Sequence, residues 1–219
     1  MGRFIVIDGL DGSGKETQTA LLVSYLTERG QKTRVLSFPR YDKPSSLFVR
    51  MYLSGELGAS PDDTNAYAAS SFFAADRYLS YRTEWQADAA DPETVLIANR
   101  YTTANAVHQL AKLPESEWDG FLGWLWDYEF YTLGIPIPSD ILYLEMTPAI
   151  SEKLIRRRAA ETGRRIDIHE ADPGFLERSY RAALYASDKL GWTRIRCYEG
   201  DEPLTRETIA QRIRAALSV

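Results

Sequence analysis

Short apolar runs alternate along the chain with longer stretches in which apolar residues recur every three or four positions. The runs predict five strands, at residues 4–7, 33–38, 95–98, 140–145 and 193–198. Most of their side chains are apolar on successive positions, which is typical of strands buried on both faces of a parallel sheet. The chain is therefore expected to fold around such a sheet.

The longer stretches predict helices between these strands. The helices are expected at about 15–29, 64–90, 102–129 with breaks, 148–160, 172–190 and 205–217. Pro148, Pro173 and Pro203 lie where the start of a helix would accept proline. Strands that alternate with helices predict an α/β fold of three layers, a doubly wound five-stranded parallel sheet with helices on both faces. Residues 1–219 show no internal repeat or linker, so a single domain is expected.

Composition narrows the class of protein. With 219 residues and a formal net charge of -5, the chain can form one sizeable core but lacks the basic balance of a dedicated nucleic-acid binder. No apolar stretch reaches about 18 residues, so no membrane span is expected, and nothing near the N-terminus resembles a signal peptide. Cys197 is the single cysteine, which excludes an internal disulfide. A cytoplasmic enzyme fits these limits.

The strongest chemical signal lies where the first predicted strand meets the first predicted helix. Gly9, four further residues, Gly14 and Lys15 form the pattern of a phosphate-binding loop. Glycines let backbone N–H groups turn toward a phosphate, the helix N-terminus adds its positive dipole end, and the lysine adds a full charge. The residues expected to bind the phosphates of ATP are Gly9, Asp11, Gly12, Ser13, Gly14, Lys15, Glu16 and Thr17.

One position departs from the pattern of that loop. The residue after the lysine is normally Ser or Thr, whose hydroxyl binds magnesium (Mg2+), but here it is Glu16 and the hydroxyl follows at Thr17. Either Thr17 or a water takes over this contact, or Asp11 holds the metal from within the loop. The alternative is a loop that binds nucleotide without turning it over.

Further arginines and aromatic residues predict a second phosphate group and a base in the same site. Arg40 and Arg100 follow the second and third predicted strands, and ligands of open parallel sheets bind at the carboxyl ends of strands. The two arginines are therefore expected to converge and hold a phosphate. Phe73 and Arg77 lie four residues apart on one helix face, where they could stack on a base and bond to its edge. A core phenylalanine beside a surface arginine is the alternative for this pair.

These groups of residues have the order and spacing found in one enzyme family. The loop at 9–15, the segments 38–41 and 99–101, and Phe73 with Arg77 resemble the motifs of bacterial thymidylate kinases, and the similarity extends over nearly the whole chain. Members of that family move the γ-phosphate of ATP to dTMP and produce dTDP. The resemblance implies a P-loop NTPase fold of the monophosphate-kinase type, magnesium as a cofactor and a homodimer.

The resemblance also implies roles for individual residues in binding dTMP. Phe73 would stack on thymine, while Arg77 and Asn105 would bond to the edge of the base. The implied contacts of the dTMP phosphate are Arg40, Tyr41 and Arg100, with Phe38 packed nearby. The residues implied near the sugar and the metal are Asp11 and Glu170.

Three further positions near these residues are Asn99, His169 and His108. Asn99 stands where the family usually has Asp, so this chain lacks the carboxylate that would place the metal or orient Arg100, although asparagine still accepts a hydrogen bond. His169 occupies a position often filled by tyrosine or isoleucine. His108 follows Asn105 by one helical turn, and both a contact with sugar or base and a structural role are open for it.

An arginine-rich segment lies before the fifth predicted strand. Residues 156–158 are three arginines at the start of a predicted lid at about 156–170. A solvated helix end is one interpretation, but the position matches the mobile lid of monophosphate kinases, which excludes water and brings arginine to the phosphoryl group. Consecutive helical residues point about 100° apart, so the three cannot all face one ligand. Arg158 is the first candidate for the transition state and Arg157 the second, while Lys15 and Arg100 complete the expected catalytic set.

Two alternative functions are left open by the sequence. One is a kinase for another pyrimidine nucleotide, such as dUMP or UMP, because recognition of the thymine methyl group cannot be inferred from the residues. The other is a nucleotide-binding regulatory protein in which Glu16 and Asn99 impair catalysis. An aromatic stretch with Trp118, Trp124 and Trp126 is interpreted as a core or subunit contact rather than as a base-stacking platform.

Overall fold

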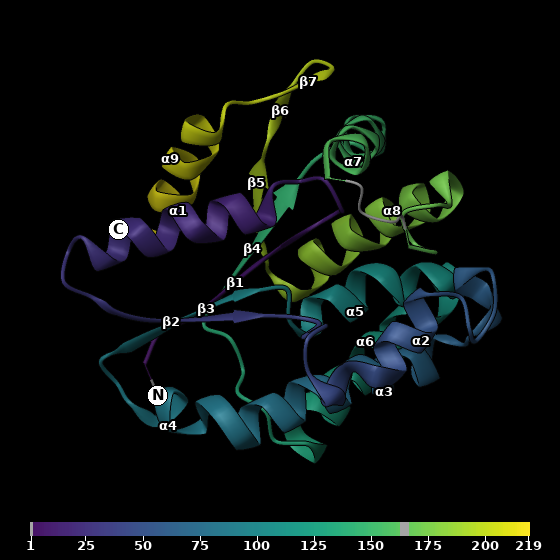
Figure 1. The fold of residues 1–219 in the computed structure, drawn as a ribbon, viewed down its shortest axis with the longest axis horizontal. Helices are drawn as coiled ribbons and strands as arrows, with labels where there is room; N and C mark the ends of the chain where they lie inside the picture. Colours follow the sequence, from purple (N-terminus) through teal and green to yellow (C-terminus); the bar gives the residue numbers. More distant parts are fainter. Residues whose placement is uncertain (1, 163–166) are drawn as a thin grey trace.

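The computed structural model describes residues 2–162 and 167–219, which contain a five-stranded parallel sheet in the order β2-β3-β1-β4-β5 (Figure 1). The strands are β1 Phe4–Gly9, β2 Lys32–Ser37, β3 Thr94–Asn99, β4 Asp140–Glu145 and β5 Thr193–Arg196. Strand β1 lies in the centre of the sheet, and every one of its residues is buried. The predicted α/β class with a five-stranded parallel sheet is therefore confirmed.

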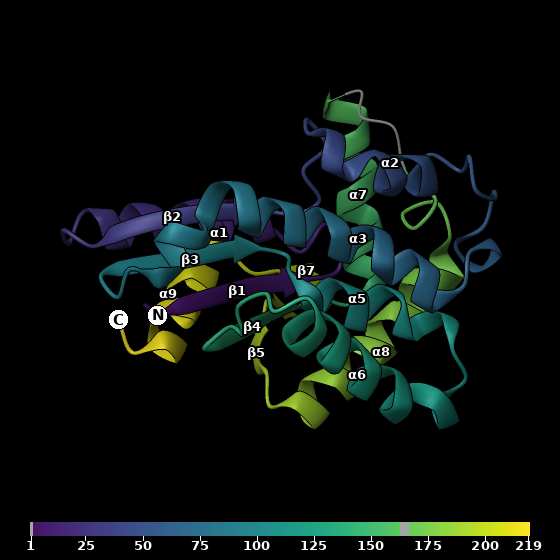
Figure 2. The ribbon, with the colours of Figure 1, turned by 90° about the horizontal axis from the view of Figure 1, so that it is seen from below.

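Helices cover both faces of this sheet. Helices α1 and α9 lie side by side on one face, and α3 to α6 and α8 lie on the other (Figures 1 and 2). The α-helices are α1 Lys15–Thr27, α2 Leu47–Leu53, α3 Ala66–Ser80, α4 Gln86–Ala90, α5 Thr102–His108, α6 Trp118–Trp126, α7 Pro148–Thr162, α8 Pro173–Leu190 and α9 Arg206–Leu217. Two π-helical turns, Tyr81–Trp85 and Asp127–Thr132, continue α3 and α6. Among the described residues, no helix combines the length and apolar character needed to cross a bilayer.

The alternation of side chains along β1 explains how one strand serves both layers. Successive residues of a strand point to opposite faces of the sheet. Ile5 and Ile7 pack in the apolar cluster that α1 and α9 complete, whereas Phe4 and Val6 pack with Trp85 on the other side. A central strand of this kind needs apolar residues on both faces, and residues 4–7 of β1 supply them. The buried Asp8 that follows accepts a hydrogen bond from the Thr103 hydroxyl.

The last predicted strand is shorter than expected. Residues 193–198 do not form one strand, because β5 ends at Arg196 and a hairpin of β6 Tyr198–Glu199 and β7 Glu202–Pro203 follows. Gly200 has a φ of 56° in the turn of this hairpin, a left-handed conformation that glycine adopts readily. The apolar run therefore continues past the point where the chain leaves the sheet.

Two further details of the helices differ from the prediction. Pro203 does not start a helix, since α9 begins three residues later at Arg206, where the Thr205 hydroxyl accepts a hydrogen bond from the backbone N–H of Thr208. Helix α2 falls where no helix is predicted, because seven residues are too few to show a clear apolar period. Pro148 and Pro173 are the first residues of α7 and α8, as predicted.

Candidate active site

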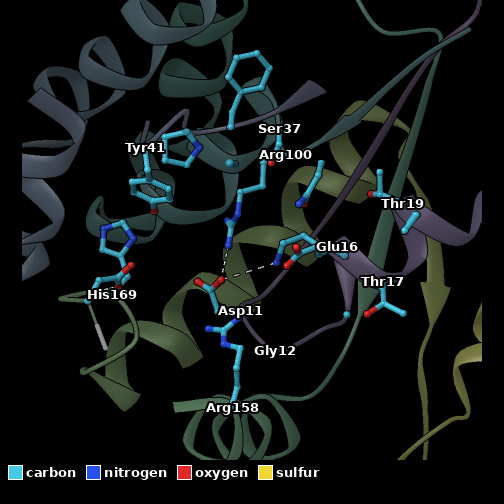
Figure 3. Close-up of a pocket in the computed structure, with 18 of the residues that line it drawn as sticks. Asp11, Gly12, Glu16, Thr17, Thr19, Ser37, Tyr41, Arg100, Arg158 and His169 are labelled. Carbon is cyan, nitrogen blue, oxygen red and sulfur yellow. Dashed lines mark hydrogen bonds and ion pairs between the residues drawn. The ribbon is translucent and has the colours of Figure 1, made fainter. Parts of the chain in front are cut away.

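The carboxyl ends of β1, β2 and β3 open into a cavity of about 960 Å³ (Figure 3). Open parallel sheets bind their ligands at this edge. The loop between β1 and α1, together with α1 itself, forms one side of the cavity, and residues of α3, α5 and α7 line other parts of it. The sequence-predicted site residues that line it are Asp11, Gly12, Gly14, Lys15, Glu16, Thr17, Phe38, Tyr41, Phe73, Arg77, Arg100, Asn105, Arg157 and Arg158.

The phosphate-binding loop owes its shape to its glycines. Gly12 and Gly14 have φ values of 81° and 85°, in the left-handed region that favours glycine. A Cβ atom on Gly9 would lie 2.7 Å from the Leu144 carbonyl oxygen, so the loop passes β4 only with glycine there. Gly9 and the buried Ser13 do not line the cavity, unlike the other predicted residues of the loop. No side chain caps α1, so the first N–H groups of that helix are left for an anion.

Lys15 is held against the loop that precedes it. Its Nζ donates to the carbonyl oxygens of Gly9 and Leu10, at 2.8 and 2.7 Å, and lies 3.9 Å from a carboxylate oxygen of Asp11. Burial, together with the nearby Arg100, lowers the pKa of Lys15 to about 8. The lysine is thus a buried cation that a triphosphate in the loop would stabilise.

Arg100 links the phosphate-binding loop to helix α5. Its backbone adopts a φ of 65°, uncommon outside glycine, while its N–H donates to the Ile7 carbonyl oxygen at 3.0 Å. Its guanidinium forms an ion pair with Asp11 (Figure 3). Its Nη1 lies 3.0 Å from Nε2 of His108. Burial by itself would raise the pKa of Asp11, but Arg100 and Lys15 hold that pKa well below its usual range. The carboxylate therefore stays ionised between two cations.

A buried polar cluster closes the end of the cavity on α3 and α5. Nε of Arg77 donates to Glu129 at 2.7 Å, and Nη1 donates to the Tyr101 carbonyl oxygen at 3.3 Å. Nδ2 of Asn105 donates to Glu129 and to the Ser70 carbonyl oxygen, at 3.1 and 3.2 Å. Arg77 and Asn105 therefore meet in one network, although they lie on different helices.

Glu129, the centre of that network, was not among the predicted site residues. It is fully buried in the π-helical turn after α6 and also accepts a hydrogen bond from the Thr102 hydroxyl at 3.0 Å. The sequence signal that could have indicated Glu129 is an acidic residue within the aromatic stretch around 118–130. A carboxylate buried among aromatic side chains requires a polar or charged partner. Trp118 is buried in the core between α5, α6 and α8, as the core interpretation of that stretch expects, whereas Trp124 and Trp126 are only partly buried.

Comparisons with known proteins point to one family. A family model described as thymidylate kinase matches residues 7–195. The chain belongs to the thymidylate kinase family. The thymidylate kinase of Mycobacterium tuberculosis is 30% identical over 192 residues, 86% of each chain, and that of Arabidopsis thaliana is 29% identical over 162 residues, 74% of this chain and 52% of its own. A solved thymidylate kinase from Candida albicans shares the fold, with a TM-score of 0.71, 19% identity, and coverage of 99% of this chain and 91% of its own.

In this thymidylate kinase family member, the two arginines predicted to converge on a phosphate lie in different environments. Arg40 is absent from the cavity lining, whereas Arg100 and Tyr41 line it. The Arg40 Nε lies 3.3 Å from Asp76, and its Nη1 lies 2.6 Å from Glu84. Two carboxylates thus hold the Arg40 guanidinium away from the site.

The arginines of the predicted thymidylate kinase lid also differ from one another. Arg158 lines the cavity and forms an ion pair with Glu170, whose side chain is only 2% exposed and does not line the cavity itself. Arg157 reaches the cavity edge, but it pairs with Glu161 at 2.9 Å, and 68% of its side chain is exposed. Arg156 pairs with a glutamate one turn earlier on the outer surface. The remaining predicted lid residues, 163–166, lie outside the described residues.

The residues that could hold magnesium can be compared with the sequence prediction of Asp11 and Thr17. Over residues 2–162 and 167–219, no group of three or more His, Cys, Asp or Glu side chains is placed to hold a metal ion. Asp11 and Thr17 line the cavity beside the loop, and Glu16 lies exposed at its edge. Magnesium commonly binds through one or two protein oxygens plus substrate phosphates and waters, and the residues present fit only that mode.

Proposed function

We propose that this member of the thymidylate kinase family transfers the γ-phosphate of ATP to dTMP and forms ADP and dTDP. The observation that carries the proposal is a single cavity that joins a phosphate-binding loop to a buried set of base-reading groups. Magnesium would enter as part of the MgATP substrate, and Asp11 and Thr17 are the residues that would hold it, directly or through water.

The hydrogen-bond polarity at Asn105 indicates which base fits. The Glu129 carboxylate and the Ser70 carbonyl oxygen can only accept, so the amide of Asn105 must direct its NH2 group toward them. Its Oδ1 is then the group left to accept a hydrogen bond from a ligand. Arg77 can only donate, and its hydrogen bonds to Glu129 and to the Tyr101 carbonyl oxygen use three of its five N–H groups.

Asn105 offers an acceptor and Arg77 offers donors, so a base that binds both must present a donor to Asn105 and an acceptor to Arg77. Thymine and uracil present an O4 acceptor next to an N3–H donor, which matches Arg77 and Asn105. Cytosine presents an amino donor next to an N3 acceptor, so it would face like groups at both positions. The cluster therefore supports a thymine or uracil nucleotide and disfavours a cytosine nucleotide. Phe73 lines the same end of the cavity, where it can stack on the base.

The reaction itself needs positioning and charge more than covalent chemistry. Arg100 and Tyr41 would hold the acceptor phosphate, and Arg40 would join them only if Asp76 and Glu84 release it. Lys15 and Arg158 would stabilise the charge on the transferred phosphoryl group, and Arg157 is the second candidate for the contact assigned to Arg158. No general base is required, because the acceptor phosphate is already anionic at neutral pH.

We also propose that the protein acts as a homodimer, as the family resemblance implies. Large apolar side chains are exposed on α3 and after α6, with Leu79 at 44% and Tyr131 at 70% exposure. Such groups are commonly buried in subunit contacts. Light scattering coupled to size exclusion tests this point, since a mass of one chain at micromolar concentration would contradict it.

An ADP-release assay with a panel of acceptors tests the proposed reaction. With ATP and magnesium, turnover is expected with dTMP, less with dUMP, and very little with dCMP or AMP. Silence with every acceptor, despite tight ATP binding, would support a regulatory protein instead. A clear preference for UMP would replace dTMP as the substrate, and dCMP as a good substrate would contradict the base polarity set by Glu129.

A further inference from the structure

His108 makes a contact that the proposed reaction does not yet explain. It is the last residue of α5, it lines the cavity, and only 6% of it is exposed. Its Nε2 lies 3.0 Å from Nη1 of Arg100, the arginine that lines the acceptor side. The other Nη group of Arg100 pairs with Asp11, so the guanidinium is held from two directions.

The chemistry of that contact fixes the form of the histidine. A guanidinium has donors only, so Nε2 of His108 must accept and must carry no proton. The imidazole is therefore neutral, with its proton on Nδ1. Burial, together with the positive charge of Arg100, lowers the pKa of His108 to about 3, which keeps this form at neutral pH.

Nδ1, the other ring nitrogen of His108, is in an unfavourable environment. Among the described residues, Nδ1 of His108 has no hydrogen-bond partner and is buried. A buried N–H without a partner is unfavourable, because it has given up its hydrogen bonds to water and gained none in exchange. The ring stacks with His169 at 5.3 Å and with Phe175 at 6.2 Å, surroundings that a phenylalanine would suit without this cost. Packing alone therefore does not account for a histidine, and the hydrogen bond to Arg100 does.

We propose that His108 is a positioning residue, which orients the guanidinium of Arg100 toward the phosphate of the acceptor nucleotide. Asp11 supplies charge on one side of that guanidinium, and the neutral imidazole supplies a directional acceptor on the other. An acid in place of His108 would compete with the phosphate for Arg100, whereas a neutral acceptor aims the group and leaves its charge available. This role rests on the proposed function, because it presumes that a phosphate of the acceptor lies against Arg100.

The test distinguishes the contribution of the dTMP phosphate to the binding affinity from that of the nucleoside. Calorimetry measures the affinity of the wild type, His108→Phe and His108→Gln for dTMP and for thymidine, which lacks the phosphate. His108→Phe keeps a flat ring but removes the acceptor, and we expect its dTMP affinity to fall about tenfold, the scale of one hydrogen bond to a charged group. Thymidine affinity should change by less than about twofold. Glutamine offers an amide oxygen at a similar reach, so His108→Gln should restore most of the dTMP affinity.

Each result has a defined meaning for the proposal. Equal losses for dTMP and thymidine would show that His108 only supports the fold of the site, and unchanged dTMP affinity would overturn the role altogether. Failure of His108→Gln to recover dTMP binding, with a melting temperature like that of the wild type, would also contradict it. Because the readout is binding, it is distinct from the proposed reaction, whose own failure would appear as wild-type protein that binds dTMP but forms no ADP.

Discussion

Glu129 accepts hydrogen bonds from two nitrogens of Arg77, and the two side chains are 0% and 1% exposed. A pair buried this deeply is favourable only when the remaining polar atoms are also satisfied. Here Thr102 and Asn105 donate further hydrogen bonds to the Glu129 carboxylate. The side chains proposed to bind the base are therefore held in place before any ligand binds. The end of the cavity that is proposed to recognise the base is therefore part of the buried hydrogen-bonded interior of the protein.

Replacing Glu129 by glutamine should damage both the fold and recognition of the acceptor. The amide has one oxygen and must direct an NH2 group toward Arg77, Thr102 or Asn105, and Arg77 is left as a buried cation without a counter-charge. We expect the free energy of unfolding to fall by about 3–5 kcal/mol and KM for dTMP to rise more than KM for ATP. Urea denaturation and steady-state kinetics measure these effects. The same change at the exposed Glu117 is the matched control and should alter neither quantity.

The two arginines that follow strand ends should differ in their effect on substrate binding. Arg100→Met removes a guanidinium from the cavity wall and should raise KM for dTMP about a hundredfold, the scale of a lost charge-assisted contact with phosphate. Arg40→Met should raise it less than about tenfold, but should lower stability because the buried Asp76 loses its partner. Kinetics and thermal melting of both variants check this order. An equal rise in KM would mean that Arg40 leaves Asp76 when substrate binds.

Arg158 and Arg157 of the predicted lid should also differ in their effect on kcat. Arg158 lies over the loop, paired with a buried glutamate, whereas Arg157 pairs with another residue at the surface. Arg158→Ala should therefore lower kcat at least about tenfold, as expected for a cation that stabilises the transferred phosphoryl group, and Arg157→Ala less than about threefold. Both are measured at saturating ATP and dTMP. The reverse order would assign the catalytic contact to Arg157.

The fold follows from local patterns far more completely than the site does. Five apolar runs predict the strands of the sheet, and the glycines that follow the first run predict the phosphate-binding loop, so each of these features could be predicted from residues that lie close together in the sequence. Arg40 and Arg100 look equivalent in sequence, because each follows a strand. Only the packing of α3 shows that Asp76 takes one of them out of the cavity.

Contacts between distant segments account for the rest of what the sequence did not predict. Glu129 lies 52 residues from Arg77, and neither residue alone indicates the other. His108 was open between a ligand contact and a structural role, and its hydrogen bond to Arg100 crosses from α5 to the end of β3. Side-chain geometry of this kind depends on how helices pack, which a pattern of apolar positions does not determine.

The pKa of Lys15 predicts how activity depends on pH. The ammonium form is the one that binds the phosphates, and burial lowers its pKa to about 8 from an ordinary value of 10.5. Raising the pH through 8 therefore removes the charge, and kcat/KM for ATP should fall above that pH because this quantity reports the free enzyme. In the enzyme–ATP complex the phosphates favour the charged lysine, so kcat should hold to a higher pH. Lys15→Arg keeps its charge throughout and should lose the alkaline decline even where its overall rate is lower. A wild-type profile of kcat/KM that stays level up to about pH 10 would contradict the lowered pKa.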